Sequence, residues 1–184
     1  LDLVDLPGLV TVDVPEYPGK RQGVFDLVSS QIAEDREGGN TSIYLVTVPA
    51  TGSPTLNNAL KFMHDMGVAD RTVGVFTKAD QSPSLERLRA FVTGEDFTET
   101  ETDGSLVIKS AAAVGAAPLE KGWVTTMLKM PQPLMYYTSA QHSIERMKKM
   151  DNEEKLFFGG EDKPFASRIL RDLFDRGYAG VGAL

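Results

Sequence analysis

The chain has 184 residues, of which 41% are hydrophobic and 24% are charged, a balance that is typical of a globular domain. Nineteen Lys and Arg residues against 26 Asp and Glu residues give a net charge of −7, which argues against a nucleic-acid partner. The absence of cysteine excludes disulfides, thiol catalysis and cysteine-based zinc sites. No apolar stretch approaches the roughly 20 residues that cross a bilayer.

The first hundred residues predict strands and helices in alternation. β-branched runs bounded by polar residues predict strands, and apolar residues at helical spacing predict helices. The predicted elements are a strand at 1–4, a helix at 22–37 stopped by Gly38 and Gly39, a strand at 42–48, a helix opened by Ser53-Pro54, a strand at 72–77 and a helix opened by Ser82-Pro83. This order predicts an α/β fold in which a parallel sheet has helices on its faces.

The second half has a weaker pattern. Glu95–Gly104 is acidic and rich in threonine, which predicts an exposed loop. The later predicted elements are a short strand at 106–108, a strand at 122–128, a helix at 139–158 with Ile144 and Met147 inward, and a helix at 164–176. Trp123 is predicted to lie in the core, and Phe157-Phe158 to pack within the helix layer.

Two short motifs follow predicted strands, at the carboxyl edge where parallel sheets bind ligands. Asp5-x-x-Gly8 is weak alone, because this composition gives about one such match by chance. Thr77-Lys78-x-Asp80 is rarer, at about 0.06 chance matches. The alternatives are a plain turn after the first strand and a solvated loop in which Asp80 only caps a helix. The two motifs together favour a guanine-nucleotide site.

The residue types suit that chemistry. A carboxylate such as that of Asp5 can hold Mg²⁺ through a water, because the ion keeps most of its hydration shell. Gly8 lets a backbone N–H approach a terminal phosphate without a Cβ in the way. Asp80 presents two acceptors to two adjacent guanine donors, a pair that adenine does not offer. The stem of Lys78 can lie along the base plane.

The sequence resembles the dynamin-like large GTPases, which include the Mx-type proteins and fungal relatives. The resemblance is carried by Leu3–Leu9, by Val48-Pro49-Ala50 and by Asp70–Asp80. It implies a three-layer, P-loop-NTPase-like fold with a mostly parallel sheet. Residues 1–135 would form the carboxyl-side part of the GTPase domain, and residues 136–184 a helical extension towards the bundle or stalk.

The resemblance also implies GTP hydrolysis to GDP and phosphate, with Mg²⁺ as cofactor. Asp5 and Gly8 would be catalytic, with Asp5 on the metal through a water. The nucleotide would be held by Asp5, Leu6, Pro7, Gly8, Thr77, Lys78, Ala79 and Asp80, and by Lys129, which stands where the family has an Asn/Cys-Arg pair.

The expected partners are GTP and GDP, a second copy of the domain, and a membrane or filament reached through parts outside this chain. The expected location is the cytoplasm, with peripheral attachment to membranes.

The sequence departs from the family pattern in one respect. The phosphate-binding loop G-x-x-x-x-G-K-[ST] does not occur, since Gly19-Lys20 is followed by Arg21. We therefore expect a piece of a longer chain that begins at the Asp5 strand and is inactive in isolation. The alternative is a guanine-nucleotide-binding or scaffolding protein without turnover.

Overall fold

The computed structural model describes residues 18–39, 42–52, 54, 57–110, 119, 121–127, 140–159 and 164–183. The predicted strand at 1–4 lies outside these residues. The helices are α1 (Lys20–Glu37), α2 (Asn58–Asp65), α3 (Leu85–Thr93), α4 (Ala140–Gly159) and α5 (Pro164–Asp175). The strands are β1 (Tyr44–Pro49), β2 (Thr72–Thr77), β3 (Asp96–Thr100), β4 (Leu106–Ser110) and β5 (Trp123–Thr125).

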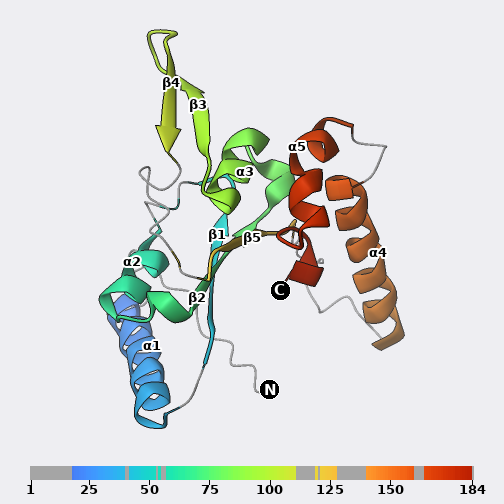
Figure 1. Ribbon diagram of the computed structural model, residues 1–184. Coiled ribbons are helices and arrows are strands. Elements are labelled where there is room, and N and C mark those ends of the chain that lie inside the picture. Colours follow the sequence, from blue (N-terminus) through green and yellow to red (C-terminus); the bar gives the residue numbers. More distant parts are fainter. Residues whose placement is uncertain are drawn as a thin grey trace.

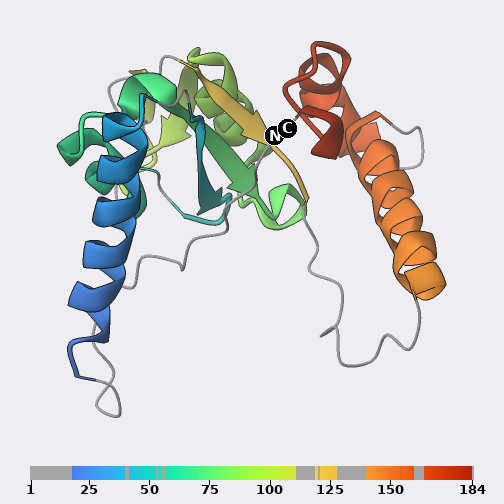
Figure 2. The same cartoon turned by 90° about the horizontal axis from the view of Figure 1, so that it is seen from below.

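Three strands form a parallel sheet in the order β1-β2-β5. Strand β2 is central, with Val46 opposite Gly74 on one side and Thr125 opposite Phe76 on the other. Helices α1 and α2 lie at one end of the sheet, and α4 and α5 lie beyond β5 at the other (Figures 1 and 2). The predicted α/β class, with a parallel sheet flanked by helices, is confirmed.

Aromatic side chains join β2 to β5 and to α3. The ring of Phe76 stacks on the indole of Trp123 at 4.5 Å between centroids, and on Phe91 of α3 at 5.9 Å. Trp123 is buried, as predicted. Gly74 makes this arrangement possible, because a Cβ at that position would overlap the indole ring of Trp123. The core therefore sits on the face of β2 that α3 covers.

The predicted strand at 72–77 coincides with β2, and the helix predicted at 22–37 is α1, which begins two residues earlier. The prediction that Ser53-Pro54 opens a helix is wrong. Helix α2 begins at Asn58, because the side-chain oxygen of Asn57 accepts hydrogen bonds from the backbone N–H groups of Ala59 and Leu60. An asparagine N-cap satisfies two orphan donors at that point.

The predicted loop at 95–104 is also wrong, because β3 and β4 form an antiparallel hairpin that projects from the body (Figure 1). Lys109 on β4 contacts Glu99 at 2.8 Å and Glu101 at 2.6 Å, which offsets the acidic charge. Phe97 of β3 is buried with its ring centroid 5.7 Å from that of Phe91. Cross-strand ion pairs and the buried ring of Phe97 thus stabilise a hairpin in a segment whose polar composition predicts a loop.

Ile144 of α4, which is predicted to face inward, is 53% exposed, and the side chain of Met147 lies outside the described residues. Leu27 of α1 is an apolar residue at helical spacing, yet it is 52% exposed. Helix α1 packs through Val28 and Ile32 instead, so the buried stripe is narrower than the apolar pattern suggests. Phe157 and Phe158 are buried, which confirms their predicted packing role.

The carboxyl-terminal part of the chain is joined to β5 by backbone hydrogen bonds and to α3 by an ion pair. Thr125 of β5 donates its N–H to the carbonyl of Tyr178 and accepts the N–H of Gly180, so the chain after α5 extends the sheet edge. Arg89 of α3 binds Asp172 of α5 through Nη2 at 2.8 Å and Nε at 3.1 Å. The proposed division into residues 1–135 and 136–184 stays a prediction.

No helix in the part of the chain that the structure describes combines the length and the apolar character needed to cross a bilayer.

We predict that Gly74→Ala destabilises the protein by about 1–3 kcal/mol, because its methyl group overpacks the contact between β2 and Trp123. Chemical denaturation measures the change. Gly23→Ala in α1 is the control, since a Cβ there meets nothing within 4 Å and should stabilise the helix by about 0.5–1 kcal/mol. Equal effects of the two substitutions would contradict the packing role of Gly74.

The ion pair between α3 and α5 should make stability depend on pH. Hydrogen bonds from Arg89 lower the pKa of the Asp172 carboxyl. A carboxyl whose pKa is lower in the folded state contributes stability above its unfolded pKa of about 4, and that contribution is lost as the pH falls below it.

Wild type should therefore be more stable than Asp172→Asn at about pH 7, and the difference should shrink as the pH falls below about 4. Denaturation midpoints of both proteins across this range give the measurement. Asp175→Asn is the control on the same helix, where the exposed pair with Arg171 spans 3.8 Å. A difference at Asp172 that does not change with pH would refute the ionic contribution.

Candidate functional site

The three parallel strands end at one edge of the sheet, and the candidate site lies there. Each strand end is tied to its neighbour: Ala50 after β1 donates its N–H to the carbonyl of Thr77 at 2.7 Å. On the other side, Lys78 donates to the carbonyl of Met127 at 3.0 Å, and Ala79 donates to the carbonyl of Thr126 at 3.1 Å. The motif Thr77-Lys78-Ala79-Asp80 therefore occupies the middle of this edge.

Lys78 has an unusual backbone conformation. Its φ is 58° and its ψ 42°, in the left-handed region, where it is the only residue other than glycine among those that the structure describes. The conformation lets the successive N–H groups of Lys78 and Ala79 both face the end of β5. Ala79 is fully buried, whereas Lys78 is exposed. The loop thus presents a lysine side chain to solvent from a backbone that two main-chain hydrogen bonds hold in place.

Asp80 lies in the 3₁₀ turn Ala79–Gln81 that follows, and its side chain is half-buried. The turn is closed by the N–H of Gln81 to the carbonyl of Lys78 at 2.9 Å, and by the N–H of Ser82 to that of Ala79 at 3.2 Å. An aspartate in the first turn can stabilise the turn locally or serve a ligand at the sheet edge. Both hypotheses for Asp80 fit this position.

The β5 side of the edge contains residues that the sequence analysis missed. Met127 donates its N–H at 2.6 Å to Oε1 of Glu154, a residue of α4 that is only 4% exposed. Thr126 is fully buried, and its hydroxyl has no hydrogen-bond partner among the described residues. The sequence pattern of Glu153–Phe158 could have indicated the burial of Glu154. Glu154 lies four residues before the buried Phe158 and therefore on the same face of the helix.

Asp5, Leu6, Pro7, Gly8 and Lys129 lie outside the described residues. Within the described ranges, no group of three or more His, Asp or Glu side chains could hold a metal ion. Of the predicted site residues, the structure therefore describes those of the base-binding loop, Thr77–Asp80.

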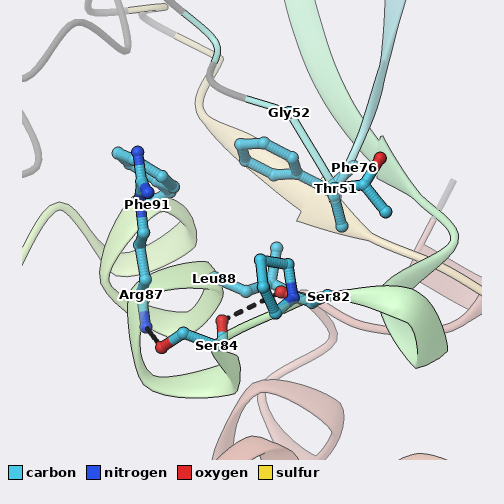
Figure 3. Close-up of a pocket in the computed structure, with 10 residues that line it drawn as sticks. Thr51, Gly52, Phe76, Ser82, Ser84, Arg87, Leu88 and Phe91 are labelled. Carbon is cyan, nitrogen blue, oxygen red and sulfur yellow. Dashed lines mark hydrogen bonds between the residues drawn. The ribbon is translucent and has the colours of Figure 1, made fainter.

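A small cavity lies beside this loop, between the end of β1 and the start of α3 (Figure 3). Its volume is about 90 Å³, well below the roughly 300 Å³ of ordinary small-molecule pockets. Its described lining includes Thr51, Gly52, Phe76, Ser82, Ser84 and Arg87, and none of the residues Thr77–Asp80. The guanidinium of Arg87 lies over the ring of Phe91 at 5.3 Å. A cavity of this volume has room for a few waters.

We predict that Lys78→Gly is more stable than Lys78→Ala by about 1 kcal/mol, because glycine adopts the left-handed conformation without a steric penalty. Both variants lose the same exposed side chain, so the comparison isolates the backbone. Chemical denaturation of the two variants measures the difference. The opposite order of stability would show that Lys78 leaves this conformation in solution.

No known family model matches the chain, and no curated protein shares significant similarity with it. The resemblance to the dynamin-like GTPases therefore rests on the sequence alone and stays a prediction.

Proposed function

We propose that the chain binds a guanine nucleotide through Thr77–Asp80, within a P-loop-NTPase-like domain of the dynamin type whose intact protein hydrolyses GTP. One observation carries the proposal. A Thr-Lys-x-Asp motif follows the central strand of a parallel sheet, and two main-chain hydrogen bonds to the end of β5 fix its backbone. Ligands of open parallel sheets bind at this edge.

Asp80 would supply base specificity. A carboxylate accepts two hydrogen bonds in one plane, which matches the adjacent ring and amino donors of guanine. Charge-assisted hydrogen bonds of this kind are worth about 1.5–3 kcal/mol each. Lys78 is exposed from a fixed backbone, so its stem can cover the base while the ammonium reaches a ribose or loop oxygen.

Asp5 and Gly8 would serve the phosphates. A carboxylate is the hard oxygen donor that Mg²⁺ prefers, and Asp5 would hold the ion through a water. Bound Mg²⁺ would neutralise charge on the phosphate oxygens during transfer. The backbone N–H of Gly8 would donate to the γ-phosphate. Lys129 would contact the second face of the base.

The family resemblance extends the proposal beyond the nucleotide. It implies self-association through the G domain and coupling of hydrolysis to membrane remodelling in the cytoplasm. Both of these expectations rest on the resemblance alone. The role of the base-recognition loop can be tested independently of self-association and membrane remodelling.

We predict that Asp80→Asn lowers affinity for GTP about a hundredfold and restores binding to XTP. The asparagine amide places a donor against a guanine donor, which together with the lost ionic hydrogen bond costs about 3 kcal/mol or more. Xanthine carries an oxygen at that position and would accept from the amide. Competition binding of GTP, ATP and XTP to the protein encoded by the complete gene measures the change.

The matched control is Asp70→Asn, an exposed aspartate just before β2, at the opposite end of the strand from the loop. It removes the same charge and should leave affinity for all three nucleotides unchanged. If Asp80→Asn still prefers GTP with wild-type affinity, Asp80 is a structural cap and the base-recognition proposal fails. Binding without phosphate release in the wild type would favour the non-catalytic alternative.

A further inference from the structure

The buried carboxylate of Glu154 bears on the candidate site from a distant part of the chain. Glu154 lies on α4 and is 4% exposed, and burying a carboxylate is unfavourable unless hydrogen bonds compensate it. Its Oε1 accepts the N–H of Met127 at 2.6 Å, a short distance that is typical of a charge-assisted hydrogen bond. Helix α4 thus contacts the chain immediately beyond β5.

That contact continues to the candidate loop through one peptide group. The N–H of Met127 and the carbonyl of Thr126 belong to the same planar unit, so they cannot reorient independently. The N–H points to Glu154, and the carbonyl accepts the N–H of Ala79 at 3.1 Å. The next carbonyl, that of Met127, accepts the N–H of Lys78 at 3.0 Å. A rotation of this peptide would break the hydrogen bonds at both of its ends.

We infer that Glu154 is a positioning residue for the loop Thr77–Asp80. It fixes the orientation of the Thr126–Met127 peptide, which in turn fixes the left-handed backbone of Lys78 and hence the place of Asp80. Its relevance to nucleotide binding rests on the proposed function. A further consequence is reciprocal: a ligand that orders the loop should also favour docking of α4, because coupling between two sites acts in both directions.

A purely structural role for Glu154 would have a different signature. In that case the carboxylate only anchors α4, and its loss would loosen α4 and Met127 without reaching the loop. Amide hydrogen exchange reports each N–H separately and therefore distinguishes the two roles. Amides of Ile32 in α1 and Gly74 in β2 serve as internal references for global unfolding.

The experiment compares amide exchange by NMR in the wild-type chain, Glu154→Ala and Glu154→Gln. In Glu154→Ala, exchange at Lys78 and Ala79 should accelerate about tenfold or more, while Ile32 and Gly74 are unchanged. Glu154→Gln keeps an acceptor oxygen of similar shape but loses the charge, so its exchange rates should fall between the other two. Glu145→Gln, exposed on the same helix, should match the wild type.

Faster exchange at Met127 alone, with Lys78 and Ala79 unchanged, would overturn the inference. If Glu154→Ala fails to fold, the Gln variant decides: rates at Lys78 and Ala79 equal to those of wild type count against the positioning role.

Guanine-nucleotide affinity of the complete gene product provides the second measurement, using a fluorescent GDP analogue. Glu154→Ala should bind about tenfold more weakly, yet it should keep the preference for guanine over adenine nucleotides, unlike a change at Asp80 itself. If amide exchange at Lys78 and Ala79 is faster but the affinity for the GDP analogue is unchanged, the positioning of the loop by Glu154 does not affect nucleotide binding. If the wild type binds no guanine nucleotide although the exchange pattern is as expected, the positioning role holds and the proposed function fails.

Discussion

The parallel pairing of β2 with strands on both sides is the constraint on which the candidate site depends. Parallel strands all end at the same edge, so residues that follow β1, β2 and β5 meet there although they are far apart in sequence. The register places the last residue of β2, Thr77, beside Pro49 of β1. The close packing of Gly74 on Trp123 keeps β2 and β5 in this register. A shifted strand would move the N–H groups of Lys78 and Ala79 away from the carbonyls of Met127 and Thr126.

Much of this framework could be predicted from the sequence because its signals are local. A run such as Thr72–Thr77, with β-branched residues and an aromatic, has few favourable conformations other than a strand. The alternation of such runs with helical patterns leaves a parallel sheet as the natural arrangement. The place of Thr77–Asp80 at the carboxyl edge follows from the same alternation. Local pattern thus located the loop, although not its conformation.

The remaining features depend on contacts between distant residues, which no local pattern encodes. The hairpin at 96–110 is stabilised by ion pairs from Lys109 to Glu99 and Glu101, and by the packing of Phe97 against Phe91. The role of Glu154 arises only when α4 reaches the end of β5. In sequence it is one of several acids in a charged helix, and its burial is what distinguishes it.

The conformation of Lys78 depends both on its local sequence and on contacts with distant residues. A left-handed backbone costs a residue with a side chain roughly 1 kcal/mol, and glycine would avoid that cost. The hydrogen bonds from Lys78 and Ala79 to the end of β5 offset the strain, and the Glu154 contact holds the peptide that accepts one of them.

The side chain of Lys78 is exposed, so it contributes little to the packing of the protein. Packing therefore does not explain why a lysine stands at this position. Strained backbone conformations cluster at active sites and ligand-binding loops. The same strain is a poor match to a solvated linker, for which a glycine or asparagine would suffice. Under the proposed function, the left-handed backbone of Lys78 would place an exposed lysine side chain beside the base, which gives the strain a role that a plain connection between β2 and α3 does not.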